Sequence, residues 1–336
     1  MTSRQNNYDP VIATDLASAV TQLRVAGIQE RDVRRHLDIV LGKRPPFAPV
    51  VEYQERLRRI QAGELACLSL PWLMLATLTR LGAPGRLTTI AGRQGAAKSI
   101  FALQLLRYWL HLGVSASAYL LEGDMGELMD RTLAQVSGVS DVTDIDWQKA
   151  NTGRMWELTG EHRADLDRVA AAVTVSAGLG LETLEDLAAW IEGEAKCGQR
   201  AIIADPVSAA MRKAQPWISD PAFVRRVKRA AIDHECSIIC VTHLVKGADE
   251  GKPDMVAGSA AYGRFSDCVL QIIRHDKKAS MVTTPVGRKE IEHSHTIYIE
   301  KTRNGSGSGC RLAMQFDAGS LTVVELGLIT KKGTGK

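Results

Sequence analysis

The stretch LTTIAGRQGAAKS, residues 87–99, decides the fold class of this chain. An apolar run typical of a β-strand leads into a short glycine-containing loop, and a Lys-Ser pair then opens the helical segment SIFALQLLRYWL. The oxygens of a triphosphate need several backbone N–H groups that point inward, and the N-terminus of a helix supplies them. The stretch therefore predicts a phosphate-binding loop between a strand and a helix; the alternative is an ordinary strand-to-helix turn.

Each polar position of this loop has an expected task. Gly92 and Gly95 allow the backbone to turn and to approach phosphate, Lys98 would reach the β- and γ-phosphates, and the Ser99 hydroxyl would ligate Mg²⁺. Ala97 stands where the pattern G-x4-G-K-[ST] has its second glycine, a change that removes no hydrogen-bond donor. We therefore predict ATP and Mg²⁺ as cofactors. The predicted nucleotide-binding residues are Gly92, Arg93, Gln94, Gly95, Ala96, Ala97, Lys98, Ser99 and Ile100.

Outward from the loop, short apolar runs alternate with helical segments. The runs lie at 87–91, 116–121, 172–176, 201–204, 237–241 and 268–273, and the helical segments near 98–112, 126–138, 182–196 and 217–233. This alternation predicts an α/β fold, with a mostly parallel sheet, helices on both faces and the ligand beyond the carboxyl ends of the strands. Three later runs, at 296–300, 311–316 and 321–325, are separated by turn residues and are typical of antiparallel strands.

Composition excludes some classes of protein. The 336 residues are 45% hydrophobic and 24% charged, with a net charge of +4, which is ordinary globular usage with a mild basic lean. The six cysteines contain no CxxC pair, so a zinc site of that type is not expected; Cys236, Cys240 and Cys268 fit a core. We find no apolar segment long enough to cross a membrane and no signal peptide, and we expect a cytoplasmic protein.

The N-terminal part shows helical spacing over 11–42, a break at Lys43-Arg-Pro-Pro46 and a charged amphipathic helix over 50–63. That last helix either covers the following domain or packs as an arm on a neighbouring subunit. We expect a helical N-terminal extension at 1–70, an ATPase domain at 71–328 and a flexible tail at 329–336.

Three strand ends downstream of the loop carry polar side chains. Asp205 ends an apolar strand and is the candidate acid that holds Mg²⁺; the alternative is a cap on the next segment. Glu122 is the candidate catalytic base, and Asp124 is the second choice, with an N-cap of the next helix as its alternative role. His243 either senses the γ-phosphate or is a hydrogen-bonded residue at a strand end.

The order of these motifs, followed by YIEKTRNG at 298–305, resembles the RecA-like ATPase domain of DnaB-type replicative helicases over about residues 70–325. The resemblance implies a RecA-like P-loop NTPase that assembles as a ring, a hexamer, with ATP between subunits. It also implies that Lys301 and Arg303 reach the ATP of the neighbouring subunit, as sensor and arginine finger in trans. Their alternation along one strand places both on the same face; the alternative is a pair of solvated cations. One departure is Thr242-His243, where the family has Ser-Gln.

In such motors the loops after the Asp205 and His243 strands line the DNA channel. Here they are 208–220 and 244–264, in which Trp217 or Tyr262 is suited to stack on a base. The candidate nucleic-acid residues are Arg212, Lys213, Lys246, Lys252 and Arg264. Acidic residues in the second loop dilute the positive charge. We interpret 275–295 as an exposed, charged hairpin and assign it no chemistry.

The sequence thus predicts an ATP-dependent motor on single-stranded DNA, a DnaB-like replicative helicase, with a replication initiator or loader as a possible partner. One alternative is a RecA-fold ATPase in regulation, recombination or mobile-element replication (RadA-, KaiC- or RepA-like) that does not unwind DNA. The other is a nucleotide-gated scaffold with negligible turnover.

Overall fold

The computed structural model describes residues 49–176, 183–244 and 260–330, with side chains from Tyr53 onward. The chain divides into two compact units, residues 1–65 and 66–336. In the first unit the described element is helix α3 (Pro49–Gln61), where the sequence predicts a helix. The spacing at 11–42 and the break at 43–46 lie outside the described residues.

The second unit is built on one nine-stranded sheet of described strands, ordered β3-β2-β4-β5-β1-β6-β7-β8-β9. The first six of these strands run parallel and the last three antiparallel, which confirms the α/β fold of mixed direction. The strands are β1 (Arg86–Gly92), β2 (Ala116–Leu120), β3 (Val173–Val175), β4 (Ala201–Asp205), β5 (Ser237–His243), β6 (Cys268–Thr284), β7 (Gly287–Thr302), β8 (Arg311–Asp317) and β9 (Thr322–Ile329).

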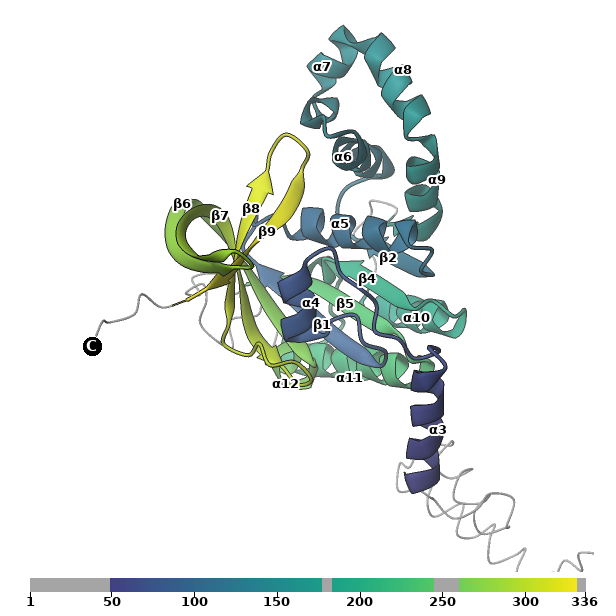
Figure 1. Ribbon diagram of the computed structural model, residues 1–336. Helices are drawn as coiled ribbons and strands as arrows, with labels where there is room; N and C mark the ends of the chain where they lie inside the picture. The colour runs from purple at the N-terminus through teal and green to yellow at the C-terminus, as the bar shows by residue number, and fades with distance from the viewer. Residues whose placement is uncertain (1–48, 177–182, 245–259, 331–336) are drawn as a thin grey trace, which may run out of the picture. The chain divides into compact units, whose positions relative to one another are not determined.

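Helices cover both faces of the parallel part, as Figure 1 shows. On one face, α5 (Lys98–His111) and the short α4 (Leu73–Thr79) enclose a core in which the rings of Trp72 and Phe101 stack at 3.9 Å. On the other face lie α10 (Leu184–Lys196), α11 (Pro216–His234) and α12 (Ala261–Phe265). Because the central strands are buried on both faces, they appear in the sequence as unbroken apolar runs. Cys236, Cys240 and Cys268 are buried in these cores, as predicted.

A helical lobe connects β2 to β3 (Figure 1); the sequence predicts its first helix, near 126–138, but not the rest of the lobe. It has a small core of its own, formed by Leu133, Val142, Leu158 and Leu166. The lobe consists of α6 (Met125–Ser137), η1 (Ser140–Thr143), α7 (Ile145–Ala150), α8 (Thr152–Glu161) and α9 (Arg163–Ala172).

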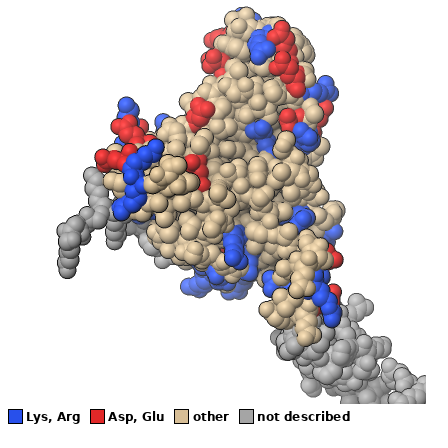
Figure 2. Space-filling view, in the orientation of Figure 1, with Lys and Arg blue, Asp and Glu red and all other residues tan. Residues whose placement is uncertain are grey.

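The expectation of an exposed hairpin at 275–295 is only partly right. Strands β6 and β7 do form one long hairpin, and Figure 2 shows cations and anions intermingled near its tip. However, β6 also pairs with β9, Val282 opposite Ile329, and this second pairing curls the sheet and creates an interior. His293 and His295 are buried there, with 2% and 4% of their surface exposed.

Candidate nucleotide-binding site

The loop after β1 has the backbone that a phosphate cradle requires. Gly95 lies at φ +75°, a region that favours glycine, and a Cβ on Gly92 would lie 2.7 Å from the Ile272 carbonyl oxygen. Ala97, directly before α5, is also left-handed, at φ 59° and ψ 25°. The family pattern has glycine at this position for that conformational reason, and here alanine adopts it at a cost of roughly 1–2 kcal/mol.

The loop lines a cavity of about 590 Å³. Of the predicted loop residues, Gln94, Gly95, Ala97, Lys98, Ser99 and Ile100 line it; Gly92, Arg93 and Ala96 do not. Strand register brings the other predicted groups to the same place, because Leu120 lies opposite Asp205 and Gly92 opposite His243. Glu122, Asp205 and His243 therefore line the cavity together with Lys98, at the carboxyl ends of four neighbouring strands.

Lys98 is only 6% exposed, and its ammonium is held in two ways. Its Nζ donates to the Arg93 carbonyl at 2.9 Å and lies 3.3 Å from Nδ1 of His243. Burial lowers the pKa of Lys98, while Asp205 and Glu122 oppose that change. The pKa of His243 is lowered by burial and by Lys98, which favours the neutral ring, so its Nδ1 can accept a hydrogen bond from the Lys98 ammonium. The His243 ring is thereby positioned to respond to any change at Lys98.

Asp205 is a buried carboxyl group whose ionised form is disfavoured by its surroundings. It is 3% exposed, and its pKa is raised to about 6 by burial, against the opposing effects of a hydrogen bond from Ser99 and the charge of Lys98. Its Oδ1 is buried without a hydrogen-bond partner among the described residues. A carboxylate oxygen without a partner beside a serine hydroxyl fits Mg²⁺, which takes one or two protein oxygens and completes its shell with water and phosphate.

Two acidic residues after β2 have different surroundings. Glu122 lines the cavity and is close enough for its charge to act on both Lys98 and Asp205. Asp124 caps α6, accepting a hydrogen bond from the Glu127 backbone nitrogen at 2.9 Å. This contact is the alternative role that the sequence offered for Asp124. Arg131, on the same helix, also lines the cavity and lowers the pKa of Asp205; the sequence analysis did not single it out.

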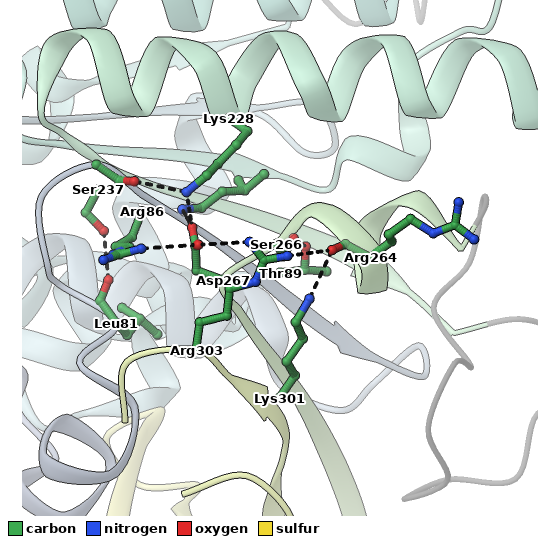
Figure 3. A network of polar contacts seen from close by, with 12 residues as sticks. Leu81, Arg86, Thr89, Lys228, Ser237, Arg264, Ser266, Asp267, Lys301 and Arg303 are labelled. Atoms are coloured by element: carbon green, nitrogen blue, oxygen red, sulfur yellow. Dashed lines mark hydrogen bonds and ion pairs between the residues drawn. The ribbon is translucent and has the colours of Figure 1, made fainter. Parts of the chain in front are cut away.

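Lys301 and Arg303 lie at the opposite edge of the sheet from the cavity, near the amino ends of the parallel strands. Thr302 pairs with Cys268, which pairs with Thr88, whereas the phosphate loop starts four positions further along β1, at Gly92. At about 3.3 Å per residue these two places are about 13 Å apart along the strand. Lys301 donates to the Gly263 and Arg264 carbonyls at 2.7 and 3.0 Å, and Arg303 donates to the Arg264 carbonyl at 3.1 Å (Figure 3). The two cations are therefore together, away from the cavity of their own chain.

The candidate nucleic-acid residues are distributed unevenly. The expectation that Tyr262 stacks on a base is wrong, because it is 1% exposed and packs in the core beneath α12. Trp217 is 68% exposed at the start of α11. Arg212 forms a 2.8 Å ion pair with the buried Asp220, which neutralises much of its charge. Lys213 and Arg264 are exposed, while Lys246 and Lys252 lie outside the described residues.

The loop at 208–220 is shorter than expected, because η2 (Val207–Ala209) and the first turns of α11 occupy parts of it. The cations on the adjoining α11 face have local partners. Arg226 contacts Glu192 at 2.6 Å, Arg229 contacts Asp233 at 2.7 Å, and Arg225 lies over the Phe265 ring. These cations therefore stabilise the fold more directly than they form a patch for DNA.

A comparison with models of protein families identifies the family to which this chain belongs. The model of the DnaB-like helicase C-terminal domain matches residues 74–320. This chain belongs to the DnaB-like helicase C-terminal domain family. The matched residues include Lys98, Glu122, Asp205 and His243 of the cavity and the Lys301–Arg303 pair. The chain is therefore a member of a family of helicases and ATPases.

Solved structures share the fold of this DnaB-like domain at low sequence identity. One solved ATPase domain matches with a TM-score of 0.62 and 14% identity, over 83% of this chain and 99% of that one. A DnaB-like replicative helicase, solved in a study of its interactions with primase, matches with a TM-score of 0.59 and 14% identity. The match covers 94% of this chain and 76% of that one. The RadB recombinase matches with a TM-score of 0.50 and 13% identity, over 77% of this chain and 99% of that one. No curated protein matched the sequence. In the described parts of the chain no helix is long and apolar enough to cross a bilayer.

Proposed function

We propose that this DnaB-like domain is an ATP-dependent motor on single-stranded DNA, a replicative helicase that hydrolyses ATP at the interfaces of a homo-oligomeric ring. One observation carries the proposal. The cavity with Lys98, Ser99, Asp205 and Glu122 lies at one edge of the sheet, and the two cations that would complete the site of a neighbouring subunit lie at the other. Each chain thus offers half of a site at each of two surfaces, which favours a head-to-tail ring.

Within one chain the residues divide the chemistry. Lys98 and the backbone N–H groups of the loop bind the β- and γ-phosphates, and Ser99 and Asp205 hold Mg²⁺, which neutralises charge on the phosphates when bound. Glu122 orients the attacking water and takes its proton, since it is a carboxylate facing the cavity. His243, in contact with the Lys98 ammonium, senses loss of the γ-phosphate and transmits it to the segment after β5.

The neighbouring subunit would supply Lys301 and Arg303. A guanidinium entering the site in trans stabilises the charge that develops on the transferred phosphoryl group. Helix α3 offers a means of holding neighbours together. Tyr53, Leu57 and Ile60 recur at the spacing of one helix face and are 56%, 38% and 42% exposed. We propose that this apolar stripe packs on an adjacent subunit as an arm.

Contact with DNA would come from the segments that follow β4 and β5. Trp217 offers an exposed ring for base stacking, and Lys213 and Arg264 offer cations for phosphates. Lys246 and Lys252 remain predicted contacts. A replication initiator or loader that places the ring on DNA would be the natural protein partner.

The experiment that tests the shared site mixes two inactive variants. Lys98→Ala has no working phosphate loop but an intact finger, and Arg303→Gln has the reverse. If the finger acts in trans, a mixture pairs intact loops with intact fingers at about a quarter of interfaces and regains that share of wild-type turnover. Arg288→Gln, the same exchange at the other end of β7, is the matched control and should retain full activity alone. A mixture no more active than its components contradicts the proposal.

A second candidate is a RecA-fold ATPase in regulation, recombination or mobile-element replication that hydrolyses ATP without unwinding DNA. The ion pair of Arg212 with Asp220 and the burial of Tyr262 favour it, because both reduce the surface expected to contact DNA. Turnover that is indifferent to single-stranded DNA, with no strand separation on a forked duplex, would select this candidate.

A further inference from the structure

A buried carboxylate lies directly behind the proposed finger, in a position that the sequence analysis did not single out. Asp267, the residue before β6, has 5% of its side chain exposed, and its carboxylate accepts a hydrogen bond from the Leu87 backbone nitrogen at 3.0 Å. Figure 3 shows Arg86, Lys228 and Arg303 converging on it from β1, α11 and the end of β7. We propose that Asp267 is the positioning residue that sets the direction of Arg303 toward the neighbouring subunit; this rests on the proposed function.

The three cations do not share Asp267 equally. Lys228 makes a close ion pair and Arg86 approaches to 3.4 Å, and their side chains are only 16% and 29% exposed. Arg303 is 3.9 Å away and 49% exposed. One negative charge thus faces three positive ones. Lys228 and Arg86 are fixed partners, and Arg303 is the member that is held least tightly and extends furthest into solvent.

The main chain adds a second constraint on the finger. The Arg303 backbone nitrogen donates to the Asp267 carbonyl oxygen at 2.8 Å, so the main chain and the side chain of Asp267 both contact Arg303. The Arg264 carbonyl, three residues earlier at the end of α12, accepts from both Lys301 and Arg303. The side chain of Arg264 extends away from this cluster in Figure 3. The backbone therefore fixes the root of Arg303, while the Asp267 charge and the Arg264 carbonyl orient its exposed guanidinium.

Removing only the charge of Asp267 separates these two constraints. In Asp267→Asn the amide oxygen can still accept from Leu87, and the main-chain bond to Arg303 is unchanged. The three cations then repel one another without compensation, and the repulsion displaces the most exposed of them. Because a misplacement of about 1 Å costs about 100-fold in rate, we expect kcat for ATP to fall about 10- to 100-fold. KM and ATP binding should stay at the wild-type value, because the phosphate loop lies at the other edge of the sheet.

The test measures ATP turnover of the full chain and of mixed rings. Asp233→Asn, the same exchange in an exposed pair on α11, is the control and should keep wild-type kcat. Asp267→Asn mixed with Lys98→Ala should regain activity as Arg303→Gln does in the same assay, because the Lys98→Ala subunit supplies a correctly held finger. Wild-type kcat in Asp267→Asn overturns the inference. So does a lack of rescue where Arg303→Gln is rescued, and this result leaves the proposed function intact. If neither variant is rescued, the finger in trans fails and the inference fails with it.

A second variant guards against loss of folding. Asp267→Asn leaves the Lys228 ammonium buried beside no anion, which is destabilising, and Asp267→Asn/Lys228→Met removes that charge and keeps the volume of its stem. If Asp267 only supports the fold, the double variant regains thermal stability and kcat together. If it positions Arg303, the double variant regains stability while kcat stays below the wild-type value, because Arg86 still repels Arg303 and the anion that attracts Arg303 is still absent, and mixing with Lys98→Ala again restores turnover.

Discussion

Replacing Asp205 by asparagine is expected to make the Mg²⁺-free protein more stable and to abolish ATP hydrolysis. Burial raises the pKa of this carboxyl from 3.8 to about 6. Each pKa unit corresponds to about 1.4 kcal/mol, so ionised Asp205 costs the folded state roughly 3 kcal/mol at pH 7.5. Asparagine is neutral and similar in shape, and the variant should recover most of that free energy.

The pH dependence gives this prediction its sign. A carboxyl whose folded-state pKa is raised stabilises the protein below its unfolded pKa, and this contribution is lost as the pH rises through the folded value. The advantage of Asp205→Asn over wild type should therefore be full above pH 6, decline between pH 6 and pH 4, and vanish below that.

The assay is urea unfolding with a chelator present, at pH 7.5 and at pH 4.5. Comparing variant with wild type at each pH cancels the contributions of all other titrating groups. Asp124→Asn is the matched control, since asparagine caps a helix as well as aspartate does, and its effect should be within about 0.5 kcal/mol at both pH values. An Asp205→Asn protein that is less stable than wild type at pH 7.5, or equally shifted at both pH values, would refute the reasoning.

Three further outcomes follow from the site and the sheet. Ala97→Val should lower the free energy of unfolding by about 1–3 kcal/mol in urea titrations, because a β-branched residue tolerates φ 59° poorly, whereas Ala97→Gly should stay within about 1 kcal/mol of wild type. Glu122→Gln should bind a fluorescent ATP analogue with wild-type affinity yet reduce kcat at least about 100-fold; unchanged turnover would remove Glu122 as the base. Burial lowers the pKa of both His275 and His295 to about 4, with a further contribution from Lys278 at His275 and from Arg274 at His295, so the unfolded chain binds protons that the folded protein does not. The free energy of unfolding of the wild type should therefore decrease as the pH falls below 6.5, and His295→Gln should make this decrease smaller. Chemical denaturation at pH 7 and at pH 5 measures the difference.

Local patterns in the sequence were sufficient to predict the strands of the sheet and the loop that joins β1 to α5. Unbroken apolar runs such as the one ending at Asp205 mark strands that are covered on both faces, and the Lys98–Ser99 pair marks the start of the next helix. Strand register then requires polar residues at the ends of parallel strands to meet, which is why Glu122 and His243 were predicted to share a site with Lys98.

Features that depend on tertiary packing were beyond these patterns. In the lobe between β2 and β3 the sequence predicts α6, but the helices that follow it are short and share a small core around Val142, so none of them carries a strong periodic signal. The sequence around Tyr262 has the composition of a loop, yet Tyr262 lies on the short helix α12 and its side chain packs into the core. Asp267 is an ordinary aspartate before a strand until Lys228 from α11 and Arg303 from the end of β7 are brought against it. Its proposed role depends entirely on residues that are distant in sequence.

The central proposal for this protein is that ATP hydrolysis drives its movement on single-stranded DNA. The most direct measurement is the steady-state ATPase rate with and without single-stranded DNA, at several salt concentrations, with Lys98→Ala as the blank and a forked duplex as the unwinding substrate. For a DNA motor we expect DNA to stimulate the ATPase rate strongly, an effect that falls steeply with salt and is reduced by Trp217→Ala, together with strand separation. Robust turnover that DNA leaves unchanged, with no strand separation, would contradict the motor and leave a partner-activated or regulatory ATPase.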